Sequence, residues 1–371
     1  MKLFSFYFPQ FYPIPENDKA WGAGFTDWDN VRSASPLFKG HHQPRVPLDG
    51  YYDQSKPETI ARQVSDMKRA NLDGVSFYHY WFDGKVVLEK PAENFLNNRD
   101  LDVSFNFTWA NETWSKRWIG KDNDIIFQQN HTDSKELWKK HFEYLLPFFK
   151  DERYYKVNNC PVFNIYNPHL IKNHDLLFKY WNDLAIKEGF NGVHFVAVLA
   201  SPSFSVERLE GYSGCLDFQP RFSANSLKID NNKLFGGVFD KLRYLPEPIL
   251  NQLTKIRHRY SGVTYINYKD AWDNIFKISN QTFVPNTKRY YSAFLDWDNT
   301  PRYKDRATIY KGASIKAFIS NLENLLSMLQ DEDSLIYINA WNEWSEGTYI
   351  EADEENADLC IQELSKLRGG E

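Results

Sequence analysis

The chain has little cysteine, no long apolar run and no glycine-rich phosphate loop. Its three cysteines (Cys160, Cys215 and Cys360) are odd in number and far apart, so they indicate neither a disulfide framework nor a zinc site. No H-E-x-x-H or C-x-x-C motif occurs. No stretch approaches the roughly 18 apolar residues that a membrane helix requires. We therefore expect no metal, no other cofactor and no membrane span.

The chain also lacks a large excess of charge, since 44 lysine and arginine residues nearly balance 49 aspartate and glutamate residues. The net charge of −5 gives no reason to expect nucleic acid or an anionic membrane surface as a partner. The first nine residues carry one lysine and a short, aromatic-rich apolar run, which is typical of a strand and not of a signal peptide. We expect a cytoplasmic location, unless a leader has been trimmed.

Aromatic residues, by contrast, make up 17% of the chain and gather in short motifs. The most informative motif, INAWNEWSEGT at residues 338–348, holds Glu343 and Glu346 among tryptophan and amide side chains. Pairs of carboxyl groups cleave glycosidic bonds, one as proton donor and the other acting at the sugar. Tryptophan faces stack on sugars and amides bind hydroxyls, so Asn339, Trp341 and Asn342 are candidate substrate-binding residues. Sugar chemistry is the leading hypothesis.

The spacing of the two carboxylates sets a geometric condition. Residues i and i+3 lie on one face of a helix or turn, but point to opposite faces of an extended strand. The pair can cooperate only if the chain turns at about Trp344. The alternative is a solvated acidic turn before the next helix, because four more acidic residues follow between positions 351 and 355.

Strand-like and helix-like segments alternate along the chain. Apolar or alternating runs predict eight strands, at residues 3–8, 74–81, 103–110, 161–166, 194–200, 215–219, 290–297 and 334–340. Helical periods occur at residues 56–71, 134–149, 169–188, 206–211, 235–259, 268–278, 314–330 and 356–367. This order predicts an α/β fold, a single (β/α)8 TIM-type barrel domain spanning residues 1–371. Long βα-loop insertions are expected at 10–52 and 222–264.

The carboxyl ends of several predicted strands carry aromatic, amide and charged groups. In TIM barrels the active site forms at this end. The candidate substrate-binding residues there are Tyr78, His79, Tyr80, Trp81, Trp109, Asn111, Glu112, Trp114, Asp296 and Trp297. Taken singly, each has a structural explanation: Tyr78 and Tyr80 could alternate with His79 between core and helix-facing positions, and the segment 296–299 could be a simple turn.

Several long motifs together resemble the WbsX-like proteins, a glycoside hydrolase family 99-like group found among polysaccharide and lipopolysaccharide biosynthesis genes. The matching stretches are YFPQFYPIPEN (7–17), WGAGFTDW (21–28), PLFKGHHQP (36–44), YHYWF (78–82), WANE (109–112), WDNTP (297–301) and NAWNEW (339–344). The resemblance covers nearly the whole chain.

The resemblance implies a (β/α)8 enzyme that cleaves α-mannosidic linkages internally in an oligosaccharide or polysaccharide. Glu343 would be the base that deprotonates the sugar's own 2-hydroxyl, which attacks the anomeric carbon to give a 1,2-anhydro sugar. Glu346 would be the general acid, and then the base that activates water. The anomeric configuration would be retained, without a metal or other cofactor.

Three alternatives remain open at this point. Asn111-Glu112 resembles the acid/base element of the large retaining glycosidase clan, with Glu343 then the nucleophile, although that clan places its acid/base after the fourth strand and Glu112 follows the third. A second alternative is a glycosyltransferase in surface polysaccharide (O-antigen or capsule) biosynthesis. A third is a glycan-binding protein without activity.

Overall fold

The structure is a computed structural model that describes residues 1–116, 121–201, 209–234, 262–280, 287–329 and 334–369. Its centre is a closed barrel of parallel strands, in which β1 pairs with both the last strand and the second. The eight barrel strands are β1 (Lys2–Tyr7), β2 (Gly74–Phe82), β4 (Ser104–Trp109), β8 (Cys160–Ile165), β9 (His194–Leu199), β10 (Gly214–Asp217), β12 (Lys288–Phe294) and β14 (Leu335–Asn339). The predicted TIM-type barrel is confirmed, and each predicted strand overlaps one of these eight.

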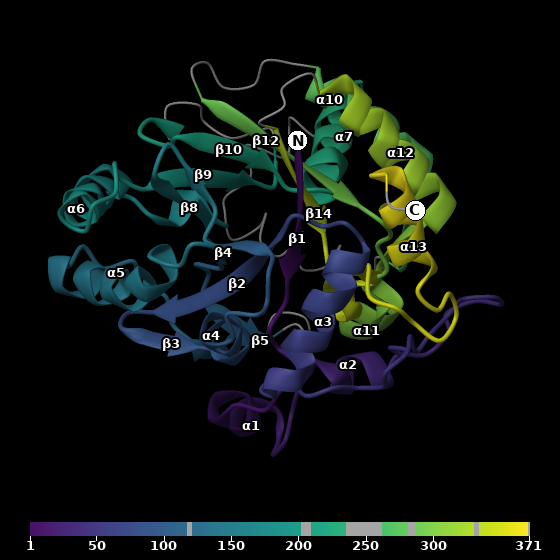
Figure 1. Cartoon of the computed structure of the whole chain (residues 1–371). Coiled ribbons are helices and arrows are strands. Elements are labelled where there is room, and N and C mark those ends of the chain that lie inside the picture. Colours follow the sequence, from purple (N-terminus) through teal and green to yellow (C-terminus); the bar gives the residue numbers. More distant parts are fainter. Residues whose placement is uncertain (117–120, 202–208, 235–261, 281–286, 330–333, 370–371) are drawn as a thin grey trace.

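Helices pack around the barrel, with α5 and α6 on one side of the view in Figure 1 and α12 and α13 on the other. They are α3 (Pro57–Arg69), α4 (Lys90–Asn97), α5 (Lys135–Phe149), α6 (His174–Lys187), α7 (Arg221–Leu234), α10 (Tyr268–Ser279), α12 (Ile315–Met328) and α13 (Leu359–Leu367). Helix α4 was not predicted, because its eight residues make too few turns to show a helical period. The helices predicted at 206–211 and 235–259 fall partly or wholly outside the described residues.

The loops at the carboxyl ends of the strands carry their own short elements. The first, between β1 and α3, holds α1 (Pro15–Trp21) and α2 (Asp27–Arg32), where few helix signals were seen. Three more follow later strands: α11 (Thr300–Tyr303), β15 (Asn342–Glu343) and the 3-10 turn η5 (Trp344–Glu346). These loops bring residues from both ends of the chain to the mouth of the barrel.

Two apolar clusters form because successive side chains of a strand point to opposite faces. The interior cluster fills the barrel and includes Phe6, Tyr78, Tyr80 and Trp344. The outer cluster lies between the strands and the helices and includes Trp109. Since both faces of each strand are buried, these strands read as nearly continuous apolar runs, as parallel strands do.

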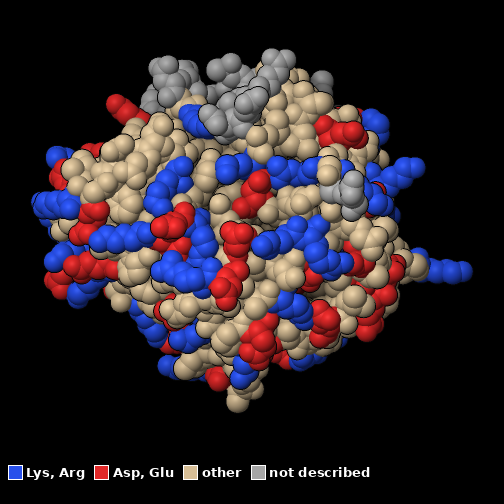
Figure 2. Space-filling model, in the orientation of Figure 1, with Lys and Arg blue, Asp and Glu red and all other residues tan. Residues whose placement is uncertain are grey.

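The surface matches the balanced composition. On the face shown in Figure 2, lysine and arginine side chains are interspersed with aspartate and glutamate. Among the helices of the described ranges, none is both long and apolar enough to cross a membrane. A single domain over residues 1–371 stays a prediction.

Candidate active site

The chain turns between the two carboxylates of the NEWSEG motif, as cooperation requires. Glu343 ends β15, and Glu346 ends the 3-10 turn η5 that follows directly. The turn closes at Gly347, which has a φ of 65°. A Cβ at Gly347 would lie 2.6 Å from the backbone oxygen of Asp298, so only glycine fits both the conformation and the space.

One guanidinium group holds both carboxylates. Arg302, on α11 after β12, donates from Nη1 to Glu346 Oε1 at 2.8 Å, and its Nη2 lies 3.6 Å from Glu343 Oε2. The same Nη2 donates to Asp27 Oδ2 at 3.0 Å. The side chains of Arg302, Glu343 and Glu346 are 11%, 8% and 10% exposed, so these charges interact largely out of water.

A second arginine approaches Glu346 from the end of β10. Arg221 Nη2 lies 3.5 Å from Glu346 Oε1, while its Nη1 donates to the Tyr166 hydroxyl at 3.0 Å. Its side chain is 43% exposed, more than any other charged group of the cluster. Two arginine side chains therefore lie within ion-pair distance of Glu346 Oε1.

The surroundings act differently on Glu343. Burial raises its pKa well above the ordinary glutamate range, and the charge of Glu346 raises it further, against the lowering effect of Arg302. Glu343 Oε2 is buried and accepts no hydrogen bond from the residues that the structure describes. The pair therefore combines a buried carboxyl group of raised pKa with a second carboxyl group that two arginines contact.

Two aromatic side chains of β2, Tyr78 and Tyr80, lie beside the pair. Both side chains point into the barrel, and burial is the main cause that raises the pKa of both phenols. The Trp114 ring packs edge-on against Tyr80, with ring centres 4.8 Å apart. Tyr78, Tyr80 and Trp114 are thus the predicted aromatic residues that lie on the carboxylate side of the barrel.

Glu112 also lies at this end of the barrel, after the third barrel strand. Its Oε1 accepts a hydrogen bond from Asn167 Nδ2 at 3.1 Å. Tyr166 raises the pKa of Arg221, and the charges of Glu346 and Glu112 add to this effect. Glu112 and Glu346 therefore both act electrostatically on Arg221.

The predicted amide residues are tied to the backbone. Asn111 exchanges two hydrogen bonds with the backbone of Asn167, at 2.8 and 2.7 Å. Asn342 does the same with Phe8, at 2.7 and 2.9 Å. Asn339 Nδ2 donates to the backbone oxygen of Gln219 at 2.9 Å. These side chains fasten neighbouring strand ends to one another, and so they position the site.

Four predicted substrate-binding residues instead pack in the outer cluster: His79, Trp81, Trp109 and Trp341. His79 Nε2 pairs with His141 Nε2 of α5 at 2.8 Å, and its ring lies against that helix. The prediction that these side chains face the substrate is wrong, because Tyr78 and Tyr80 take the inward positions of β2 and leave the outward ones to His79 and Trp81. Trp341 is fully buried.

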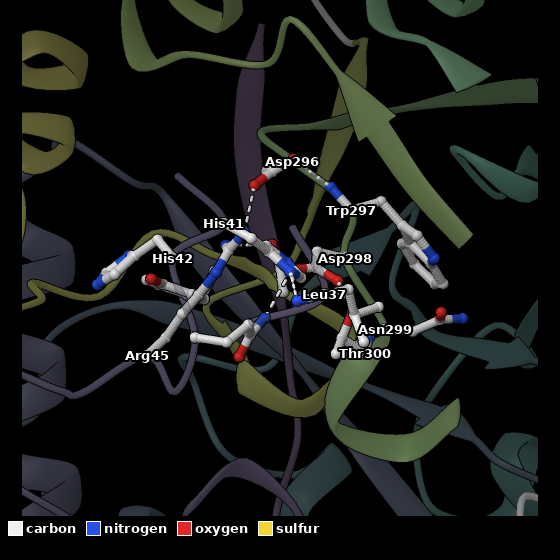
Figure 3. Close-up of polar contacts among 12 residues, drawn as sticks. Leu37, His41, His42, Arg45, Asp296, Trp297, Asp298, Asn299 and Thr300 are labelled. Atoms are coloured by element: carbon white, nitrogen blue, oxygen red, sulfur yellow. Dashed lines mark hydrogen bonds and ion pairs between the residues drawn. The ribbon is translucent and has the colours of Figure 1, made fainter. Parts of the chain in front are cut away.

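Asp296 and Trp297 occupy different surroundings. Asp296 binds Arg45 Nη2 at 2.7 Å and lines a separate pocket of about 430 Å³ with Tyr349. Figure 3 shows Trp297 directed away from this pair. Its ring belongs to the outer cluster, yet the Arg221 guanidinium lies 5.9 Å from the ring centre. Asp296 thus lies outside the carboxylate cluster.

The prediction missed Asp27, Tyr166, Arg221 and Arg302. A signal was present for three of them: Asp27 lies in the WGAGFTDW stretch, Arg221 ends the strand-end run DFQPR, and Arg302 directly follows WDNTP. Nothing in the sequence shows that residues 27, 221 and 302 join the carboxylate cluster, because only the paths of the loops bring them there.

A family model described as "Glycosyltransferase WbsX" matches residues 3–364. The chain belongs to the WbsX family. This confirms the resemblance drawn from the motifs.

Two curated relatives of this WbsX-family chain are proteins named "Uncharacterized protein WxcX", from Xanthomonas campestris pv. campestris strains B100 and ATCC 33913. Each is 28% identical over 356 residues, which cover 95% of the chain but 47% of the relative. The chain thus spans about half their length.

Solved structures share the fold. A GH99 endo-α-mannosidase from Bacteroides thetaiotaomicron superimposes with a TM-score of 0.57 at 14% identity, covering 99% of this chain and 96% of that one. A protein titled "Glycoside hydrolase-like protein" gives the same TM-score at 13% identity, over 99% and 93% of the two chains. At such identities the likeness shows that the WbsX-family chain shares the barrel fold, and the activity has to be argued from the site.

Proposed function

We propose that the chain is a retaining glycoside hydrolase that acts within a polysaccharide, on an α-mannoside-like linkage, through a 1,2-anhydro sugar. Glu343 and Glu346 share the acid and base roles. The sugar's 2-hydroxyl attacks its own anomeric carbon as the glycosidic bond breaks. Water then opens the anhydro ring, and the two inversions give net retention.

One observation carries this proposal: two carboxyl groups at the barrel mouth meet the same arginine, and the pKa of one is raised. A glycosidase needs one carboxyl group protonated and one ionised near neutral pH. The buried Glu343 Oε2, which accepts no hydrogen bond from the described residues, is suited to receive a substrate group.

The resemblance and the contacts differ over which glutamate carries the proton. By resemblance, Glu343 is the base and Glu346 the acid. In the structure, two arginines contact Glu346, while burial raises the pKa of Glu343. The reverse assignment, with Glu343 as proton donor, is therefore a second candidate within the same mechanism.

A glycosyltransferase of surface polysaccharide assembly is the second candidate function. The description of the family model supports it. It predicts that the chain passes a sugar from an activated donor to a glycan acceptor, and that polysaccharides incubated with water alone stay intact.

Incubation with a panel of α-mannans and bacterial surface polysaccharides, read by product mass, tests the hydrolase. Glu343→Gln and Glu346→Gln should each lower kcat by about 10²–10⁴-fold, equivalent to about 3–5 kcal/mol of barrier. Asp296→Asn is the matched control, because Asp296 lies at the same end of the barrel but binds Arg45 instead of Arg302. It should keep most activity.

Leaving-group dependence separates the roles. The variant that lacks the acid should recover activity on a substrate with a good leaving group, because departure then needs less protonation. Rescue of Glu346→Gln supports the assignment by resemblance, and rescue of Glu343→Gln supports the reverse. A 2-deoxy substrate should be inert in either case. A covalent adduct on Glu343, with rescue of Glu112→Gln, would replace the anhydro mechanism by the double-displacement alternative.

A further inference from the structure

We propose that Asp298 is a positioning residue of the candidate active site: its buried carboxylate fixes the one loop that holds the backbone of Glu346 and carries Arg302. This inference rests on the proposed function of the Glu343–Glu346 pair. It concerns a residue beyond the pair and a role exerted through the loop that follows β12.

The Asp298 carboxylate is the centre of a buried polar network, drawn in Figure 3. Its side chain is 2% exposed. Oδ2 accepts hydrogen bonds from His41 Nε2 at 2.7 Å and from Gln43 Nε2 at 2.6 Å, and Arg45 Nη2 lies 3.7 Å away. All three donors come from the loop after β1. Asp298 thus connects the first βα loop of the barrel to the seventh.

The direction of the His41 hydrogen bond is fixed by its other nitrogen. The backbone N–H of Leu37 donates to His41 Nδ1 at 3.0 Å. A neutral imidazole has one protonated nitrogen, so Nε2 carries the hydrogen and donates it to Asp298. The Phe38 ring stacks on this imidazole, with ring centres 4.5 Å apart. His41 is therefore held as a hydrogen-bond donor to the Asp298 carboxylate.

The charge on Asp298 is maintained despite burial. Burial raises the pKa of this carboxyl group, but Arg45 and the hydrogen bonds from Thr300, His41 and Gln43 outweigh that effect and bring the pKa below its ordinary value. A buried carboxylate with this many donors is stiff, because each donor constrains its position. It is therefore a firm anchor for the backbone on either side.

On one side, that backbone contacts the catalytic turn directly. The N–H of Asp298 donates to the carbonyl oxygen of Glu346 at 2.9 Å. The missing side chain of Gly347 is what allows this approach, since a Cβ there would lie 2.6 Å from the Asp298 carbonyl oxygen and 2.9 Å from its nitrogen. Arg45 Nη1 also donates to the Gly347 carbonyl oxygen, at 3.0 Å. The position of the Glu346 backbone thus depends on Asp298 and Arg45.

On the other side, Asp298 holds the start of the helix that carries Arg302. Its Oδ1 accepts from the backbone N–H of Thr300 at 3.1 Å and from the Thr300 hydroxyl at 2.5 Å. Thr300 is the first residue of α11, and Arg302 lies two residues further on. One carboxylate therefore positions both the backbone of Glu346 and the guanidinium group of Arg302, which binds the Glu346 side chain. A shift of about 1 Å in such groups can cost about a hundredfold in rate.

Asp298→Asn and Asp296→Asn form a matched pair of variants. Both remove one negative charge from the same loop beside Arg45, but only Asp298 contacts the Glu346 backbone and α11. On the polysaccharide that the wild type cleaves, Asp298→Asn should lower kcat by about tenfold to a hundredfold with little change in KM. Asp296→Asn acts on the catalytic turn only through Arg45, so it should lower kcat by less than Asp298→Asn does. Thr300→Val, which removes one donor without changing charge, should lower kcat in the same direction by less.

A substrate-free measurement keeps this test separate from the proposed function. Titration of chain labelled with ¹³C at the glutamate carboxyl carbons, with Glu343 assigned from Glu343→Gln, follows the coupling within the pair. Loosening Glu346 weakens its repulsion of Glu343, so Asp298→Asn and Thr300→Val should lower the Glu343 pKa toward its ordinary value, whereas Asp296→Asn should lower it less than either. Equal titrations in the three variants overturn the positioning role. If the variants show these pKa shifts but the wild type cleaves none of the polysaccharides, only the hydrolase proposal is overturned.

Discussion

Replacement of Arg302 by methionine should destabilise the chain strongly, and the loss should depend on pH. Methionine keeps much of the volume of the arginine stem but leaves Asp27 and Glu346, bound at 3.0 and 2.8 Å, without this cation. Removing one partner from a buried ion pair costs about 3–5 kcal/mol, because the remaining charge is left in a poorly solvating environment. Ser345 and Asn30 still donate to Asp27, and Arg221 still faces Glu346, so we expect about 3 kcal/mol at pH 8.

The sign of the pH dependence follows from linkage. Arg302 lowers the raised pKa of the neighbouring Glu343, so without it that pKa rises further, and the folded variant binds more protons than the folded wild type at mildly acidic pH. Stability then falls as pH rises through that window. The difference from wild type should therefore be largest at pH 8 and clearly smaller at pH 5. Urea denaturation at the two pH values measures it.

Arg32→Met is the control for this experiment. Arg32 is half exposed and pairs with Asp29 at 3.8 Å, within one helix. Exposed pairs of this kind contribute less than about 0.5 kcal/mol, so its removal should change little at either pH. A loss below about 1 kcal/mol for Arg302→Met, or an equal loss at pH 5 and pH 8, would refute the view that Arg302 compensates buried charge.

Two further predictions concern the catalytic turn. Glu343→Gln should stabilise the chain relative to wild type at pH values above the ordinary glutamate pKa, and not below it. The reason is that the raised pKa of Glu343 makes the wild type lose stability as pH rises. Urea midpoints at pH 4 and pH 8 check this, and a difference that does not change with pH would contradict it. Gly347→Ala should cost about 1–3 kcal/mol and most of the activity, since the φ of 65° and the 2.6 Å approach to Asp298 both oppose a side chain; a variant with wild-type stability and rate would contradict the close packing.

The barrel could be predicted from the sequence because parallel strands are buried on both faces. Their apolar runs, separated by helical periods, gave all eight strands in order. The same double burial hides which face of a strand points inward, since both faces are apolar. That is why His79 and Trp81 were predicted at the site beside Tyr78 and Tyr80, whereas only the two tyrosines face it.

The carboxylate pair was predictable for a different reason. Glu343 and Glu346 are close in sequence, so a local turn suffices to bring them together, and the structure has that turn. Arg302 and Asp27 approach them from distant segments, and their meeting depends on the paths of two loops. The short helices α2 and α11, which carry these residues, are too brief to leave a periodic signal.

The hydrolase and transferase proposals meet at one chemical step. In the anhydro mechanism, the pair first releases the leaving group and then activates whatever hydroxyl opens the three-membered ring. Water as acceptor gives hydrolysis, and a sugar hydroxyl gives transfer with the same retained configuration. The residues that bind the acceptor, and not the pair itself, then decide the outcome. Glu112, Arg221, Tyr80 and Trp114 lie at that end of the barrel, and we expect them to bind the acceptor. Added oligosaccharide acceptors should therefore divert product from hydrolysis to transfer in the wild type, and replacing Trp114 should change that ratio more than the total rate.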